Sequence, residues 1–144
     1  MAPFKFKLQQ VLEYRTQLED QAKLVMAEVQ RKYEKQVQRV DGLRESFAEN
    51  QALMSSTSDP AQAWIIRNFL QGVRQDISTA EHRLLTLAQE LHSARQDLTE
   101  KSQEKKLLEK LKENQAKRHA HEEKTKEQQQ LDETATLRFK AQAF

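Results

Sequence analysis

The histidines near the C-terminal end are the side chains of this chain best suited to bind a metal ion. The segment HAHEE contains His119, His121, Glu122 and Glu123, and imidazole and carboxylate groups are ordinary zinc ligands. On a helix, residues two apart point to different faces, whereas pairs of ligands need spacings of three or four. His82 and His92 are ten residues apart and are expected to be solvated. The spacing therefore predicts no metal site.

Side chains that act as nucleophiles or acid–base groups are present but are not arranged for catalysis. The chain has no cysteine and only two glycines, Gly42 and Gly72, which excludes a catalytic thiol and a glycine-rich phosphate loop. Serines cluster in the segment MSSTSDPAQ, where helix capping explains them. Catalysis needs residues that converge on a pocket. We therefore expect a protein that is not an enzyme and has no cofactor.

The segment from Lys101 to Lys126 is rich in cations, with nine Lys or Arg against five Glu and two histidines. One interpretation is a positive surface for an acidic protein partner or for nucleic acid. The other is a solvated helix that carries pairs of opposite charge four residues apart. The segment lacks aromatic residues that could stack on bases, which argues against single-stranded nucleic acid. We favour the solvated helix or an acidic protein partner and expect no nucleic acid.

The composition indicates which elements carry these residues. The 144 residues are 32% charged and 37% apolar, with a formal net charge of +2. Few glycines and prolines together with many charged residues are typical of long helices or a coiled coil. No apolar run approaches the roughly 20 residues of a membrane span, and the N-terminus lacks a signal-peptide core. We expect a soluble protein of a reducing, cytoplasmic compartment.

One turn divides the chain into two helices. Asp59 is expected to cap the second helix and Pro60 to be its first residue, and Gln62 is placed to close a capping box. The predicted organisation is a single domain over residues 1–144. Its first helix spans about 4–55, its turn about 56–60 and its second helix about 61–139.

Apolar residues repeat along both predicted helices. In the second helix they follow a strict heptad, which is typical of a coiled coil: Ile66, Leu70, Val73, Ile77, Ala80, Leu84, Leu87, Leu91, Ala94 and Leu98. The first helix is less regular: Phe4, Leu8, Val11, Leu18, Ala22, Val25, Val29, Tyr33, Val37, Val40, Leu43 and Phe47. Steps of four from Val25 to Val37 predict a stripe that drifts around the helix and a local loosening of the supercoil.

A hairpin that folds at residue 57 places opposite each other residues whose numbers sum to about 115. Phe4 then lies opposite Leu111, and Gly42 opposite Gly72. The same register sets Arg15 opposite Lys101, a like-charged layer. Residues from about 112 onward have no intramolecular partner. The predicted fold is therefore all-α, an antiparallel coiled-coil hairpin with the second helix overhanging at the C-terminus. A parallel homodimer through the second helix is the alternative.

Several apolar residues lie off the main stripe. Phe6, Leu12 and Tyr14 are predicted to form a second apolar face that one partner helix cannot cover, which indicates another protein. Phe47, Trp64 and Phe69 cluster near the turn. Core filling is the simpler interpretation for Phe47 and for Trp64.

Two short motifs resemble those of a known family. FKFKLQQVLEYR, at residues 4–15, is similar to the pattern Phe-x-Phe-x-Leu-x-x-Val-Leu-x-Tyr-Arg, and LDETA, at 131–135, is similar to Leu-Asp-Glu-x-Ala. Together with the length and the hairpin plan, they identify the chain as a member of the flagellar FliJ family. Stalk proteins of the type III secretion injectisome share this plan and remain an alternative, as do a generic coiled-coil tether and a basic-tailed nucleic-acid binder.

The resemblance implies a non-catalytic component of the flagellar type III protein export apparatus. Such a coiled-coil stalk binds the hexameric export ATPase, the cytoplasmic domain of the export gate and export chaperones. It associates peripherally with the inner membrane at the flagellar base, through partners only, and serves flagellum biogenesis, motility and chemotaxis. The residues proposed for ATPase binding are Phe6, Leu12, Tyr14, Arg15, Leu131, Asp132, Glu133 and Ala135. The residues proposed for gate binding lie at the turn end: Val40, Phe47, Phe69 and Val73. Val40 and Val73 are expected to contribute through flanks of their side chains that are exposed.

Overall fold

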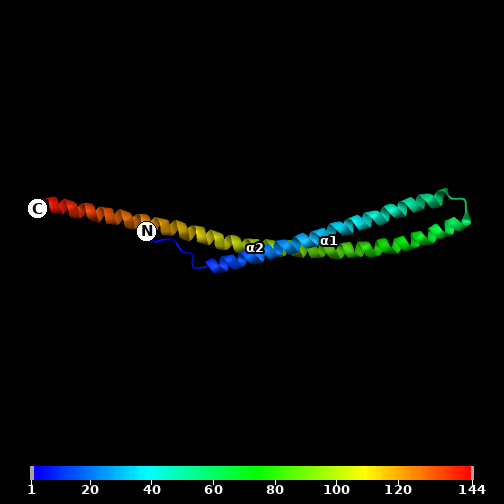
Figure 1. Ribbon diagram of the computed structural model, residues 1–144, viewed down its shortest axis with the longest axis horizontal. Helices are drawn as coiled ribbons and strands as arrows, with labels where there is room; N and C mark the ends of the chain where they lie inside the picture. The colour runs from blue at the N-terminus through cyan, green and yellow to red at the C-terminus, as the bar shows by residue number, and fades with distance from the viewer. Residues whose placement is uncertain (1, 144) are drawn as a thin grey trace. The chain divides into compact units, whose positions relative to one another are not determined.

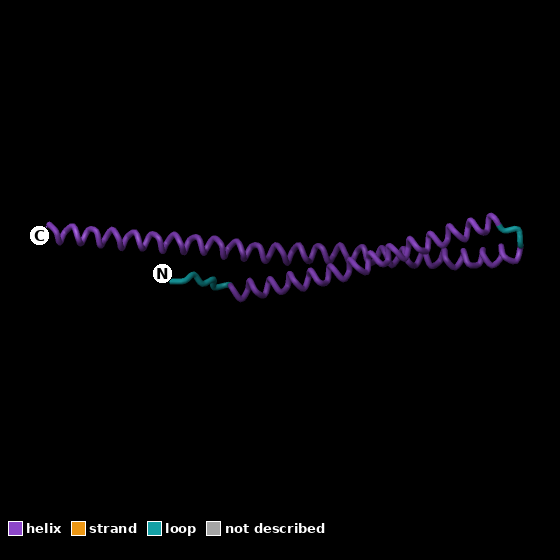
Figure 2. The backbone as a smooth tube through the Cα atoms, turned by 45° about the horizontal axis from the view of Figure 1, so that its top comes forward, coloured by secondary structure: helices purple, strands orange, loops and turns teal. Residues whose placement is uncertain are grey.

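The computed structural model describes residues 2–143 and contains two helices, α1 (Gln9–Ser56) and α2 (Pro60–Ala143), with no strand in that part of the chain. The helices pack against each other in an antiparallel hairpin (Figure 1), which confirms the predicted fold class. The first helix begins at Gln9, and not near residue 4. Residues 2–6 are non-helical, and residues 7 and 8 form a turn before the helix (Figure 2). The second helix continues to Ala143, past the predicted end at 139.

The chain divides into two compact units, each with segments of both helices. Unit 1 comprises the residues up to Glu19 together with those from Lys101 onward. Unit 2 comprises Asp20–Glu100 and includes the turn. The two units differ in the residues that they bury, and each is described separately below.

The turn is built from the capping residues that the sequence predicted. The Asp59 carboxylate accepts a hydrogen bond of 3.0 Å from the Ala61 backbone N–H, and Pro60 is the first helical residue. This is the arrangement that satisfies an otherwise unpaired N–H at a helix start. The predicted capping box is wrong, because the Gln62 side chain accepts a hydrogen bond of 3.0 Å from the Thr57 hydroxyl instead.

Unit 2 has an apolar core that follows one heptad on each helix. On α2 the predicted heptad is confirmed, and its most deeply buried members include Val73, Ala80, Leu87 and Leu91. On α1 the less exposed positions include Ala22, Met26, Val29, Tyr33, Gln36, Val40, Leu43, Phe47, Asn50 and Met54, and Gln30, Val37 and Ser46 are less exposed as well. The first ten of these positions alternate in steps of three and four, and the other three lie beside them; the predicted local loosening of the supercoil stays a prediction.

Two polar residues lie at core positions of α1. Gln36 and Asn50 occupy heptad positions that a search for apolar residues passes over. The Gln36 side-chain amide donates a hydrogen bond of 2.9 Å to the backbone carbonyl of Ala80 on α2. The Asn50 amide donates one of 2.7 Å to the Ser46 carbonyl of its own helix. Because both amides have partners, the heptad continues through them at little cost in unsatisfied polar groups.

Unit 1 has charged residues at the corresponding positions. The less exposed residues of α1 there include Leu12, Arg15 and the buried Glu19, and those of α2 include Lys101, Lys105, Leu108 and Lys112. Arg15 forms an ion pair of 2.5 Å with Glu104. Lys105 contacts Glu19 at 3.3 Å and Glu109 at 3.7 Å. The prediction that Arg15 forms a like-charged layer with Lys101 is therefore wrong, because the Arg15 guanidinium pairs with the carboxylate of Glu104.

The pairing of the two chain segments is displaced from the predicted register in unit 1, whereas in unit 2 Gln36 and Ala80, whose numbers sum to 116, agree with it. In unit 1, Phe4 contacts the ring of His119 with centroids 5.7 Å apart, and not Leu111. In unit 2, a Cβ atom built on Gly42 or Gly72 would meet no atom within 4 Å, so the two glycines do not face each other closely. The turn lies at residues 57–59, and the non-helical N-terminal segment covers more length per residue than a helix. Phe4 therefore reaches further along α2 than a helical residue would.

The N-terminal segment (residues 2–8) covers part of the predicted overhang. The Ala2 carbonyl lies 3.0 Å from His119 Nε2, and Lys112 Nζ donates to the Gln9 side chain at 2.8 Å. The α2 residues that are less exposed continue through Lys112, Ala116, His119 and Glu123. From 124 to 142 every residue is exposed. The C-terminal extension, which we define as residues 124–143, therefore starts about three helical turns later than predicted.

Candidate partner-binding surfaces

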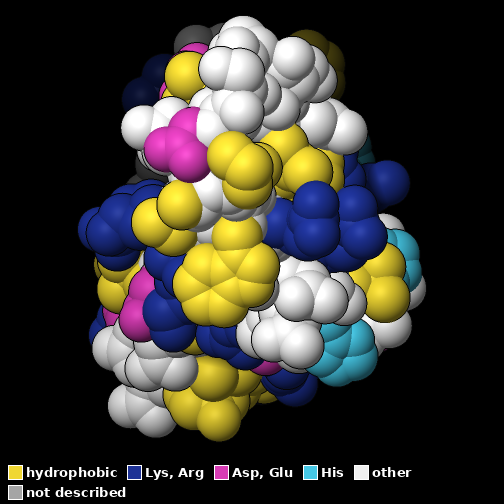
Figure 3. Space-filling view, turned by 90° about the vertical axis from the view of Figure 1, so that its right-hand side faces the viewer, with side chains coloured by type: hydrophobic (Ala, Val, Ile, Leu, Met, Phe, Trp, Pro, Cys, Tyr) yellow, Lys and Arg dark blue, Asp and Glu magenta, His cyan; other side chains and the backbone are white. Residues whose placement is uncertain are grey.

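The turn end of unit 2 exposes large apolar side chains. Leu53, Trp64, Ile65 and Phe69 are each about half exposed or more, and we call this set the turn-end surface. Figure 3 looks onto this end and shows hydrophobic side chains between Lys and Arg side chains. A cluster of this kind on the surface of a slender helix pair is typical of a site that binds another protein.

Only part of the predicted gate-binding set lies on that surface. Val40 and Val73 are 4% and 5% exposed, so the expectation that their flanks are exposed is wrong. Both are heptad residues that face the partner helix. Phe47 is half-buried, and the Arg74 guanidinium lies 5.5 Å from its ring centroid, which is within the range of a cation–π contact. Phe69 alone of the four is well exposed.

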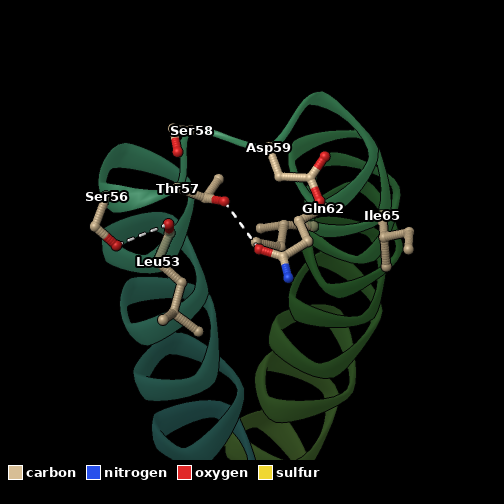
Figure 4. Close-up of a pocket in the computed structure, with 8 residues that line it drawn as sticks. Leu53, Ser56, Thr57, Ser58, Asp59, Gln62 and Ile65 are labelled. Atoms are coloured by element: carbon tan, nitrogen blue, oxygen red, sulfur yellow. Dashed lines mark hydrogen bonds between the residues drawn. The ribbon is translucent and has the colours of Figure 1, made fainter.

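A groove of about 590 Å³ lies beside the turn (Figure 4). Apolar side chains of both helices and polar groups of the turn line it: Leu53, Ser56, Thr57, Ser58, Asp59, Gln62, Ile65 and Ile66. The hydroxyls of Ser56 and Thr57 are occupied by hydrogen bonds to the Leu53 carbonyl and the Gln62 side chain. The groove can therefore take an apolar side chain of a partner, and its polar groups support the turn.

A surface ion pair joins the two helices further from the turn. Arg44 hydrogen-bonds to Glu81, and this contact together with the charge of Glu81 raises the pKa of Arg44 above its ordinary value. The pair is solvent-exposed, and such pairs contribute little to stability. The pair shows that the surface positions of Arg44 on α1 and Glu81 on α2 are adjacent in unit 2.

In unit 1 the apolar surface consists of other residues than predicted. Phe6 and Leu12 are each 8% exposed, so the prediction that they form an uncovered face is wrong. Leu12 is a heptad residue, and Phe6 lies in the turn that precedes α1, where its carbonyl accepts a hydrogen bond of 3.1 Å from the Gln9 N–H. Arg15 is directed to Glu104. Tyr14 is exposed, as predicted.

Outside the C-terminal extension, the exposed large apolar residues of unit 1 come from both of its chain segments. They are Leu8, Val11, Tyr14, Leu107 and Leu111, and we call them the outer face of unit 1. The sequence carried a signal for this arrangement. The heptad of the second half of α1 extends back through Glu19, Arg15 and Leu12, but only if charged residues are allowed at core positions.

The C-terminal extension carries the remaining predicted site residues. Leu131, Asp132, Glu133 and Ala135 are all exposed. Leu137 and Phe139 add apolar surface, at 67% and 74% exposure. Asp132 accepts a hydrogen bond from Gln128 of the same helix at 3.3 Å. The structure thus brings these residues together on one uncovered helix and leaves them available to a partner.

Charge differs between the two units. Unit 1 holds 14 Lys and Arg against 10 Asp and Glu, whereas unit 2 holds 10 against 12. Part of the positive charge is paired along α2, at Lys117–Glu113 and Arg118–Glu122, as the solvated-helix interpretation predicts. The excess in unit 1 favours a partner surface with acidic residues.

The described residues contain no group of three or more His, Cys, Asp and Glu that could hold a metal ion. The His119 side chain contacts Ala2 and Phe4 of the N-terminal segment. No helix in residues 2–143 combines the length and the apolar character that crossing a bilayer requires.

These observations define a class of protein, a helical-hairpin coiled coil with large apolar side chains exposed at its surface. The family model described as "Flagellar FliJ protein" matches residues 4–143. The chain belongs to the FliJ family, and it is a structural, coiled-coil protein related to flagellar protein export. Searches of curated proteins and of solved structures returned no match.

Proposed function

We propose that this protein is the coiled-coil stalk that connects the hexameric flagellar export ATPase to the cytoplasmic domain of the export gate, and that it also binds export chaperones. It would act at the cytoplasmic face of the inner membrane, at the flagellar base, through its partners. ATP hydrolysis and transport would belong to those partners. Family membership supports the flagellar system over the injectisome.

The C-terminal extension is the observation that carries the ATPase-binding part of the proposal. It is a single helix about 30 Å long, without cover from the N-terminal segment and with Leu131, Leu137 and Phe139 exposed. A lone helix of this length is only marginally stable in water. A surrounding protein surface, such as the lumen of a ring, would stabilise it by covering these side chains.

The outer face of unit 1 would extend the contact with the ATPase. Of the N-terminal residues first considered, Tyr14 keeps this role, and Leu8 and Val11 replace Phe6 and Leu12 because they are exposed. Arg15 would support the site indirectly through its ion pair with Glu104. The excess of cations in unit 1 predicts binding to an acidic surface that weakens as salt is added.

The turn-end surface would bind the gate. Phe69, Trp64 and Ile65 are exposed there, and the groove beside the turn can receive an apolar side chain. Phe47, Val40 and Val73 would contribute by holding the two helices together beneath that surface.

A crossed pair of variants tests the proposal. Deletion of residues 124–144 should abolish stimulation of the export ATPase and leave gate binding intact. Phe69→Ser should weaken gate binding at least tenfold, a loss of about 1.4 kcal/mol, and leave ATPase stimulation intact. Measurements are ATP hydrolysis rates and binding isotherms with the purified ATPase and gate domain.

Leu24→Ser is the matched control, since Leu24 is exposed but lies outside the three surfaces. It should change neither activity. Normal ATPase stimulation by the truncated protein would refute the role of the extension. If the full-length chain binds neither partner, the chain is a tether of another kind.

A further inference from the structure

Unit 1 buries the charged residue Glu19 and exposes several apolar residues. Glu19 is 5% exposed and lies against Lys105, whereas Leu8 and Val11 are 39% and 41% exposed and Leu107 is 70% exposed. Burial of charge costs free energy unless every charge has a good partner, and exposure of apolar surface forgoes hydrophobic stabilisation. The arrangement in unit 1 therefore has two costs in folding free energy, the buried charge of Glu19 and the exposed apolar surface of Leu8, Val11 and Leu107.

The first half of α1 carries two overlapping heptads. In the structure the buried stripe passes through Leu12, Arg15 and Glu19. A second stripe, Leu8, Val11, Arg15 and Leu18, has the same alternation of three and four and is more apolar. Both stripes include Arg15. On a helix with 3.6 residues per turn their centres are about 50° apart.

The facing segment of α2 also carries two stripes, one that is buried and one that is an alternative. Its buried stripe is Lys101, Lys105, Leu108 and Lys112. The alternative stripe consists of Glu104, Leu108 and Leu111, and it has Leu108 in common with the buried stripe. In the alternative stripe, the exposed Leu111 takes the place of Lys112, and Glu104, the ion-pair partner of Arg15, takes the place of Lys105. In each helix the alternative residues come one position before the buried ones, so in an antiparallel pair they lie on the same side of the interface.

We propose that unit 1 is a two-state element in which α1 and α2 turn about their axes between these two heptads. The state described here, the charged state, is held by the pairs Arg15–Glu104, Glu19–Lys105 and Gln9–Lys112 and by the burial of Phe6 and Leu12. In the other, the apolar state, Val11 packs against Leu108 and Leu111, Leu18 becomes a core residue, and Glu19 and Lys105 turn to solvent.

The two states would present different surfaces to a partner. The outer face of unit 1 exists only in the charged state, because its Val11 and Leu111 become core residues in the apolar state. A partner that binds this face would therefore hold the charged state, and its release would permit the apolar state. The inference rests on the two stripes and does not depend on the identity of the partner.

Thiol labelling of the full chain tests the proposal, since the sequence has no cysteine. Val11→Cys and Leu12→Cys are introduced one at a time, alone and together with Glu19→Gln. In the native background the thiol at 11 should react faster than the thiol at 12. Loss of the Glu19 charge should reverse this order, so that the ratio of the two rates falls from above one to below one.

Two further variants separate rotation from unfolding. Glu28→Gln removes one half of an exposed pair with Lys32 within α1 and should leave the ratio unchanged. Addition of Leu111→Gln to Glu19→Gln removes an apolar-state core residue and should restore the native ratio. Faster reaction at both positions in Glu19→Gln would mean that unit 1 has only loosened, and an unchanged ratio would mean that it has one register. Either result would overturn the proposal.

Discussion

At the scale of residues, polar side chains at heptad positions separate the two units. In unit 2, Gln36 donates a hydrogen bond to the Ala80 carbonyl of α2 and Asn50 donates one to the Ser46 carbonyl of its own helix, and apolar core residues lie on both sides. In unit 1, Arg15 and Glu19 of α1 depend on ion pairs with Glu104 and Lys105 of α2. Stability should therefore be concentrated in unit 2, where leucines are removed from water most completely.

Leu87 provides the clearest test of that expectation. It is 2% exposed, the most deeply buried large side chain among the described residues. Leu87→Ala should lower the free energy of unfolding by about 2–4 kcal/mol, because the lost transfer energy and the cavity add. Leu131→Ala, in the exposed C-terminal extension, should cost well under about 1 kcal/mol. Chemical denaturation measures both, and equal losses would show that residue 131 is packed.

At the scale of elements, α2 has covered and uncovered parts within one continuous helix. The N-terminal segment contacts α2 at His119, through Ala2 and Phe4. From residue 124 to residue 142 every residue of α2 is exposed. A helix without tertiary contacts is held by its own backbone hydrogen bonds and frays readily.

Amide hydrogen exchange should reveal this boundary. Amides of residues 124–142 should exchange close to the rate of an open chain, because local opening there breaks no packing. Amides of α2 around Leu87 and Leu91 should be protected to near the global free energy of unfolding. Those from 112 to 123 should lie between, and removal of residues 2–8 should lower their protection. Uniform protection to residue 142 would contradict this description of the extension.

At the scale of the whole molecule, the fold is a hairpin within one chain, and a parallel dimer through α2 is not needed to cover the α1 stripe. Unit 2 shows this through contacts that join its two helices, such as Arg44–Glu81 and Gln36 with the Ala80 carbonyl. Most of the exposed large apolar residues are grouped in the turn-end surface, the outer face of unit 1 and the C-terminal extension, and Leu24, Val25 and Leu85 lie outside these surfaces. Those three surfaces are the places where partners are expected.

Cysteine pairs test the register of the hairpin. Arg44→Cys with Glu81→Cys should crosslink within one chain through a short bifunctional thiol reagent, because the native side chains meet there. Gly42→Cys with Gly72→Cys should form no disulfide, since a Cβ atom at either position has no neighbour within 4 Å and a disulfide needs Cβ atoms about 3.8 Å apart. Mass spectrometry distinguishes crosslinks within a chain from those between chains. Crosslinks found only between chains would contradict the hairpin.

The sequence by itself determined the two helices, the turn, the heptad of α2 and the family. These features are local: Asp59 caps α2 through its own neighbour, Pro60 fixes the helix start, and apolar residues repeat at intervals that a single helix imposes. The C-terminal candidates Leu131, Asp132, Glu133 and Ala135 were also predicted to be uncovered, and they are.

Only the tertiary structure decided which stripe of α1 is buried. The sequence offers a more apolar stripe through Val11 and Leu18 and a charged one through Leu12 and Glu19. Partners on α2 select the charged stripe, because Glu104 and Lys105 pair with Arg15 and Glu19 across the interface. That choice places Phe6 and Leu12 inside and Leu8 and Val11 outside. The reason is physical: charge pairing between helices depends on register, and register is a property of two segments that are distant in sequence.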